Sequence, residues 1–249
     1  MRRLLFAANW KMHLAPAEAR AYLADFLPRY EAQADREVWF FPAAVAVEAV
    51  AQEIAGRPGL RAGAQDVHWE PKGAFTGAVS AQMAARTGAR AVLVGHSERR
   101  HVFGETDQET GRKVRAALDA DLIPVLCVGE TLAEREAGQT LGVVVRQLAA
   151  GLEGLRTDHL DDVVVAYEPV WAIGTGKNAT PADAASIHQE VRRWLRDRGA
   201  TQVSVLYGGS VNLRNIRDLL AERELDGVLV GGASLDPVAW AELVRTPAA

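Results

Sequence analysis

Short apolar runs alternate with longer amphipathic stretches along the chain. The runs are rich in β-branched residues, which is typical of strands buried on both faces. The stretches between them repeat apolar positions every three to four residues, as amphipathic helices do. Runs begin about every thirty residues, the length of one strand–loop–helix–loop unit. The eight runs are Leu4–Ala8, Val38–Phe41, Leu60–Ala64, Ala91–Val94, Ile123–Val128, Val163–Tyr167, Val203–Tyr207 and Gly227–Val230.

Proline and cap residues mark where several of the predicted helices begin. Pro16 opens the first amphipathic stretch, and Asp236 precedes Pro237 at the last one. Thr180 stands before Pro181, so a favoured cap residue precedes a proline at the first helical position. These signals place helices between the apolar runs.

Eight strand–helix units without a linker or an internal repeat predict an α/β fold, a closed (β/α)8 barrel of eight parallel strands. An open doubly wound sheet is the alternative, but such sheets usually have about five or six strands. The length also favours a barrel, for which about 250 residues is typical. We therefore expect residues 1–249 to form a single (β/α)8 barrel domain, in which Thr246–Ala249 is a tail without an assigned element.

Composition narrows the class of protein. The chain is 49% hydrophobic, which excludes a disordered chain, and its single cysteine, Cys127, excludes a disulfide scaffold. A net charge of −4 provides no basic surface, so we expect no nucleic-acid partner. No apolar run approaches the ~18 residues of a membrane span, and Asn9–Lys11 interrupts the apolar start before it reaches secretory length. We expect a soluble protein of the cytoplasm, with Cys127 buried in its core.

Glycine-rich segments follow two neighbouring strands, at the end where a barrel carries its active site. Gly208-Gly209-Ser210 follows the seventh run, and Gly231-Gly232 follows the eighth. Backbone N–H groups that no side chain covers bind anions, and barrels commonly hold phosphate at these two loops. A single glycine doublet would more simply turn the chain, but two adjacent doublets favour a bound phosphate. Gly174-Thr-Gly176, which follows the sixth run, would form a third wall of this phosphate site.

Three titratable residues follow other strands at the same end. Glu168 follows the sixth run, His96 the fourth, and Lys11 the first, two residues after Asn9. Each residue alone is typical of a solvated or structural position. Together, beside a phosphate site, they favour proton transfer next to a carbonyl, which needs no cofactor. Lys11 is one of only four lysines among 28 basic residues, which favours a specific role for its compact ammonium group. The histidines show no metal-ligand spacing, so we expect no metal.

Six short motifs follow one another from the first strand to the eighth. They are Ala8-Asn-Trp-Lys-Met12, Gly73-Ala-Phe-Thr-Gly77, Gly95-His-Ser-Glu-Arg-Arg100, Ala166-Tyr-Glu-Pro-Val-Trp-Ala-Ile-Gly-Thr-Gly176, Tyr207-Gly-Gly-Ser-Val211 and Leu229-Val-Gly-Gly-Ala-Ser234. In this order and at this spacing they resemble the triosephosphate isomerase family. The resemblance implies a cofactor-free isomerase that interconverts dihydroxyacetone phosphate and D-glyceraldehyde 3-phosphate.

The resemblance also implies a role for each candidate residue. Glu168 would be the base that moves a proton between adjacent carbons, and His96 a neutral imidazole that stabilises the enediolate. Lys11, positioned by Glu98, would hold the phosphate side and the developing negative charge. The remaining implied substrate-binding residues are Asn9, Gly174, Ser210, Gly231 and Gly232, and the implied lid runs from Pro169 to Lys177.

A second copy of the chain is the implied partner. The resemblance makes Gly73–Gly77 a protruding dimer loop, with Thr76 reaching toward the neighbour's active site. Ala78 stands where many family members carry an acidic residue, so one contact across the dimer is in doubt.

Two other functions remain open from the residues alone. Another phosphate-binding barrel enzyme would share the glycine doublets, although a Schiff-base aldolase would need a buried lysine on a late strand. A non-catalytic barrel would be expected to lose Glu168 or His96 while keeping its core.

Overall fold

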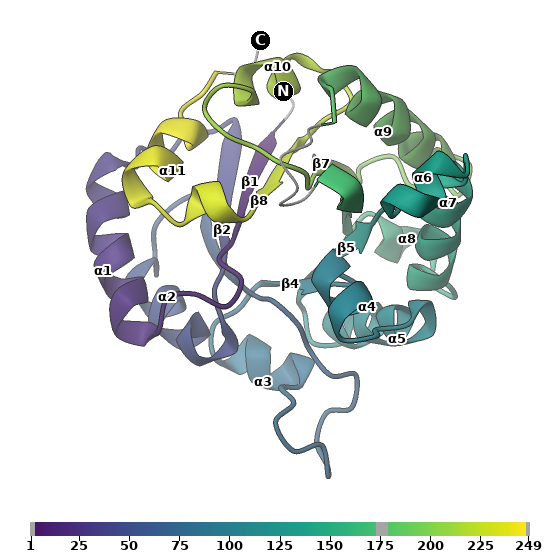
Figure 1. Cartoon of the computed structure of the whole chain (residues 1–249). Coiled ribbons are helices and arrows are strands. Elements are labelled where there is room, and N and C mark those ends of the chain that lie inside the picture. Colours follow the sequence, from purple (N-terminus) through teal and green to yellow (C-terminus); the bar gives the residue numbers. More distant parts are fainter. Residues whose placement is uncertain (1–2, 173–178, 248–249) are drawn as a thin grey trace.

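Eight parallel strands form a closed barrel with helices around it (Figure 1). The computed structural model describes residues 3–172 and 179–247. Neighbouring strands pair in chain order, and β1 closes the barrel by pairing with β8, with Leu5 opposite Gly227. The strands are β1 (Leu4–Asn9), β2 (Arg36–Phe41), β3 (Leu60–Ala64), β4 (Ala91–Val94), β5 (Ile123–Val128), β6 (Val164–Tyr167), β7 (Ser204–Tyr207) and β8 (Gly227–Val230). The predicted barrel is therefore confirmed.

Strand β2 departs most from its predicted bounds, because it begins at Arg36 rather than Val38. Arg36 and Glu37 are polar, yet they are buried in the strand and pair in register with Leu4 and Leu5. Ion pairs make this possible: the Glu37 carboxylate lies 2.7 Å from Arg3 and 3.0 Å from Arg61. Paired charges can occupy a position that an apolar pattern leaves out.

The helices lie between successive strands and cover the outside of the barrel (Figure 1). Their starts agree with the cap signals, since α1, α9 and α11 begin at Pro16, Pro181 and Pro237. The Thr180 hydroxyl accepts a hydrogen bond from the Asp183 N–H at 3.1 Å, and this caps α9. The helices are α1 (Pro16–Phe26), α2 (Val47–Glu53), α3 (Ala81–Arg86), α4 (Ser97–Val102), α5 (Asp107–Leu118), α6 (Leu132–Glu136), α7 (Thr140–Gly151), α8 (Thr157–Leu160), α9 (Pro181–Arg196), α10 (Ile216–Ala221) and α11 (Pro237–Val244).

Buried side chains fill the inside of the barrel, so it is a packed core and not a pore. Trp39 and Phe41 of β2 are the largest of them, and Cys127 of β5 is buried among them as a free thiol. Small residues elsewhere make room for the aromatic rings. A Cβ atom at Gly63 of β3 would collide with the ring of Phe41.

No helix among the described residues combines the length and the apolar character that crossing a membrane requires. One long connection stands out instead. The loop between β3 and α3, which contains Gly73–Gly77, projects from the side of the barrel (Figure 1).

Candidate active site

Apart from Glu98, which pairs with Lys11 beside it, the predicted site residues that the structure describes lie at the carboxyl ends of the strands and line one cavity of about 320 Å³. Asn9 ends β1, His96 follows β4 and Glu168 follows β6. The other predicted residues on the cavity wall are Lys11, Ser210, Gly231 and Gly232. Gly174 and residues 173–177 of the predicted lid lie outside the described residues.

Glu168 is held by its backbone and by its side chain. Its N–H donates to the Val128 carbonyl at 2.7 Å, which continues the β5–β6 pairing by one residue. One carboxylate oxygen, Oε2, accepts the Ser97 N–H at 2.8 Å, and the other, Oε1, lies 3.0 Å from His96 Nε2. With 2% of its surface exposed, Glu168 is a buried carboxylate beside an imidazole.

Glu168 and His96 shift each other's pKa in opposite directions. Burial alone would raise the pKa of Glu168, but His96 and the Ser97 N–H outweigh burial and hold that pKa below its usual range. Burial alone would lower the pKa of His96, and the Glu168 carboxylate outweighs it and raises that pKa. Glu168 is consequently ionised at neutral pH, as a base must be.

The proton of a neutral His96 ring is placed by its neighbours. The Glu98 N–H, in the first turn of α4, donates to Nδ1 at 3.3 Å, so Nδ1 acts as an acceptor. A neutral imidazole then carries its proton on Nε2, which faces Glu168 and the cavity. The Asn9 amide nitrogen lies 3.1 Å from the same Nε2.

Lys11 reaches the cavity from an unusual backbone conformation. Its φ of 51° lies in the left-handed region, which costs a non-glycine residue about 1–3 kcal/mol. The ammonium Nζ lies 2.6 Å from Glu98 Oε1, and it is partly exposed to the cavity. A Cβ at Gly231 would lie 3.0 Å from Lys11 Cε, so the absence of a side chain at this position leaves room for the lysine side chain.

The glycine loops after β7 and β8 complete the wall opposite these residues. A Cβ at Gly208 would approach Glu168 Cγ to 2.8 Å, so this glycine lets the carboxylate side chain pass. The Ser210 hydroxyl donates to the Ala172 carbonyl at 2.9 Å, which leaves the backbone of this loop to face the cavity. Around Gly232 the space on the Cβ side is open. Together these loops present backbone to a ligand with few covering side chains.

Sequence reasoning missed a second buried carboxylate, Glu130, which follows β5 and is fully buried. It accepts hydrogen bonds from Tyr167 Oη at 3.1 Å and Trp171 Nε1 at 2.9 Å. Its position directly after a predicted strand was visible in the sequence, but these two partners were not. Glu130 thus anchors the segment that follows Glu168, because the Val170 N–H also donates to its carbonyl at 3.1 Å.

Gly129 packs directly against the backbone of Glu168, and a Cβ there would collide with the Glu168 carbonyl oxygen. We expect Gly129→Ala to destabilise the fold by about 1–3 kcal/mol and to lower kcat, since Glu168 must shift. Gly142→Ala is the control, because the space on the Cβ side is open at this position in α7. It should stabilise by about 0.5–1 kcal/mol. Urea unfolding and turnover test both, and equal effects would contradict the prediction.

Within residues 3–172 and 179–247, no group of three or more His, Cys, Asp or Glu side chains is arranged to hold a metal ion.

A (β/α)8 barrel with this arrangement at its strand ends belongs to the class of barrel enzymes that work by acid–base chemistry. The model of one family, described as triosephosphate isomerase, matches residues 4–247. The chain belongs to the triosephosphate isomerase family, and the resemblance drawn from the motifs is confirmed.

Curated relatives agree with this family over nearly their full length. A triosephosphate isomerase of Symbiobacterium thermophilum is 49% identical, with 100% of this chain and 98% of the relative aligned. Those of Moorella thermoacetica and Thermus thermophilus are 49% and 46% identical, each with 98% of this chain and 99% of the relative aligned.

Proposed function

We propose that this protein is a cofactor-independent isomerase that interconverts dihydroxyacetone phosphate and D-glyceraldehyde 3-phosphate, a step of glycolysis and gluconeogenesis. One observation carries the proposal: a buried ionised carboxylate, Glu168, lies 3.0 Å from an imidazole nitrogen in a cavity walled by glycine loops. Membership of the family gives the reaction its substrate.

Glu168 acts as the base. It removes a proton from the carbon beside the carbonyl and returns it to the neighbouring carbon, through an enediolate. A carboxylate in water is a weak base toward a carbon acid, so burial and fixed hydrogen-bond donors are needed to lower the barrier. His96 supplies one donor: its Nε2, which lies 3.0 Å from Glu168 and lines the cavity, stabilises the developing oxyanion when substrate is bound.

Lys11 and the glycine loops hold the phosphate. The Lys11 ammonium supplies a fixed positive charge, which Glu98 positions and Asn9 supports from the end of β1. Gly174, Ser210, Gly231 and Gly232 bind the phosphate oxygens through backbone N–H groups, and Pro169–Lys177 closes over them. A held phosphate places the reacting carbons against Glu168, which converts binding energy into rate.

A coupled assay with glyceraldehyde 3-phosphate tests this function, with and without a phosphorylated hydroxamate inhibitor. We expect turnover that the inhibitor abolishes. A Schiff-base aldolase would instead be trapped by borohydride, but β6, β7 and β8 carry no lysine. Binding of the inhibitor without any turnover would support the non-catalytic barrel and contradict the proposal.

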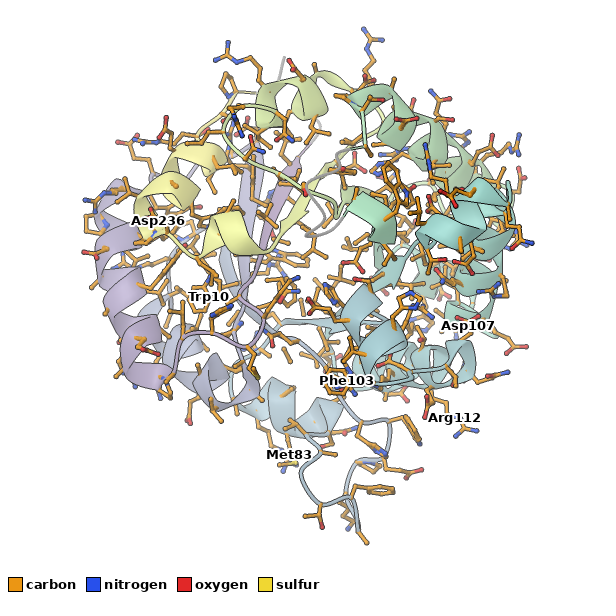
Figure 2. All side chains as sticks on the ribbon, viewed as in Figure 1. Trp10, Met83, Phe103, Asp107, Arg112 and Asp236 are labelled. Carbon is orange, nitrogen blue, oxygen red and sulfur yellow. The ribbon has the colours of Figure 1, made fainter. Side chains whose placement is uncertain are left out.

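We propose further that two copies of the chain form a homodimer through the Gly73–Gly77 loop, with Thr76 entering the partner. Beside this loop lies a hollow of about 520 Å³, whose lining includes Ala44 and Phe103. Figure 2 shows Met83 and Phe103 on the side from which the loop projects. Large apolar side chains are exposed on the loops after β1 to β4 and on the helices that follow, namely Met12, Val45, Phe75, Met83, Val102 and Phe103.

A charge in this surface should break the dimer. We expect Phe103→Asp to weaken self-association on the order of 100-fold, since an unpaired buried carboxylate costs about 3 kcal/mol or more. Val238→Asp is the control, because Val238 is also exposed but lies at the start of α11. Sedimentation velocity measures both, and a wild-type monomer at micromolar concentration would contradict the homodimer.

We also propose that residues 1–249 act as one barrel domain in the cytoplasm. The buried free thiol of Cys127 fits a reducing compartment.

A further inference from the structure

We infer that Gln65 is a positioning residue that fixes Lys11 for substrate binding, an inference that rests on the role proposed for Lys11. Gln65 directly follows β3, a strand to which sequence reasoning assigned no site residue. Its side chain reaches across β2 to the loop that carries the lysine. Gln65 is thus separate from the glycine loops after β7 and β8, to which phosphate binding is assigned.

Lys11 needs a restraint on both sides of its Cα, because its φ of 51° is unfavourable for a residue with a side chain. The Asn9 side chain supplies one restraint, since its Oδ1 accepts the Lys11 N–H at 3.0 Å. Gln65 supplies the other, since its Nε2 donates to the Lys11 carbonyl at 2.8 Å. The two side chains together hold both peptide groups of the strained residue.

The Gln65 amide has a second partner that anchors it to the barrel. The same Nε2 donates to the Phe41 carbonyl at the end of β2, also at 2.8 Å. Both partners are carbonyl oxygens, so the NH2 group must face them and both of its hydrogens are used. The Trp10 N–H donates to that Phe41 carbonyl as well, at 3.1 Å, so the loop after β1 is tied to β2 beside Lys11.

These contacts place the reactive end of the lysine. Nζ lies at the far end of a long side chain, so a small rotation of the Lys11 backbone moves it away from Glu98 and the cavity. Displacements of about 1 Å in a site of this kind cost up to ~10²-fold in rate. Gln65 therefore acts through Lys11 and contacts no reacting atom.

The test measures binding of 2-phosphoglycolate, and of inorganic phosphate, to a double-mutant cycle of Gln65 and Lys11. Gln65→Met keeps the length of the side chain and removes both donors. We expect it to raise the Kd of 2-phosphoglycolate and the KM about tenfold, with a smaller change in kcat. In a Lys11→Met background, the same Gln65→Met change should alter the Kd less than about twofold.

Gln65→Glu sharpens the test, because it places a carboxylate oxygen against two carbonyl oxygens and should raise the Kd more than Gln65→Met does. Gln52→Met is the matched control, since among the contacts described the exposed Gln52 side chain bonds only Arg20. An equal rise in Kd in both Lys11 backgrounds would overturn the inference, and so would no rise in the wild-type background.

The protein concentration distinguishes a role in association from a role in positioning Lys11. Gln65 also lines the 520 Å³ hollow beside the loop proposed to form the dimer, so every variant is measured at several concentrations. A defect that vanishes at high concentration would assign Gln65 to association and overturn the inference. Phosphate binding without turnover in the wild type would contradict the proposed function, yet the cycle would still test the coupling between Gln65 and Lys11.

Discussion

Replacing Glu168 by Gln should lower kcat by about 10²–10⁴-fold while KM changes little, because the amide cannot accept the proton. Glu168→Asp keeps the charge but withdraws the carboxylate by about one methylene, and ~1 Å of misplacement costs ~10²-fold. Steady-state assays in both directions measure these losses. Turnover of Glu168→Asp at the wild-type rate would show that Glu168 is not the base.

Measuring the stability of the Glu168 variants distinguishes a loss of catalysis from a loss of folded protein. The lowered pKa of Glu168 means that its ionised form stabilises the fold at neutral pH, so Glu168→Gln is expected to lower the free energy of unfolding while the protein stays folded. Glu153→Gln, an exposed position at the end of α7, serves as the matched control and should retain full activity.

The pH dependence follows from the direction of the Glu168 shift. Its pKa is below the usual range in the free enzyme, so any stability that its ionised form adds is complete above the ordinary pKa near 4.5. That contribution is lost as the pH falls through the lowered pKa. Glu168→Gln should remove this part of the acid limb of stability.

Lys11→Met should lower kcat/KM by roughly 30- to 4,000-fold, the equivalent of about 2–5 kcal/mol for one truncated partner of a close charge pair. The loss combines a missing phosphate contact with a Glu98 carboxylate that has lost the ammonium 2.6 Å away. Most of the loss in kcat/KM should appear as a higher Kd for 2-phosphoglycolate.

Two variants control for charge and shape. Arg57→Met removes the same charge at an exposed position before β3, at the opposite end of the barrel, and should change kcat/KM less than twofold. Lys11→Arg keeps the charge but replaces a compact ammonium with a planar guanidinium, so an intermediate loss in kcat/KM is expected. Near-normal inhibitor binding by Lys11→Met would contradict the cation role.

Periodicity sufficed for the barrel because strands buried on both faces leave a clear apolar signal. Four strands have the bounds that the pattern predicts, namely β3, β4, β5 and β8. Arg36 and Glu37 were missed at the start of β2, since their burial depends on partners distant in sequence: Glu37 pairs with Arg3 and Arg61, and Arg36 donates to the Val244 and Thr246 carbonyls. Propensity at one position contains no information about such partners.

The residues of the candidate site that directly follow strands could be predicted from the sequence. Glu168, His96 and Lys11 each follow a recognisable strand, and the topology of a barrel brings strand ends together. Gln65 and Gln147 were not predictable, because a glutamine that bonds two backbone groups looks like a surface residue in the sequence. Gln147 of α7 accepts the Gly129 N–H at 2.7 Å, and only the fold makes them neighbours.

The collision that a Cβ at Gly63 would make with Phe41 also bears on how this lineage can change. Phe41 fills volume that a residue on the neighbouring strand vacates, and packed interiors tolerate exchange best when total volume is kept. Any larger residue at position 63 would require both a smaller one at position 41 and a shift of the Ala91 backbone, whose carbonyl oxygen lies 2.9 Å from that Cβ, so the two sites are epistatic. Related barrels are expected to vary them together, or to keep both.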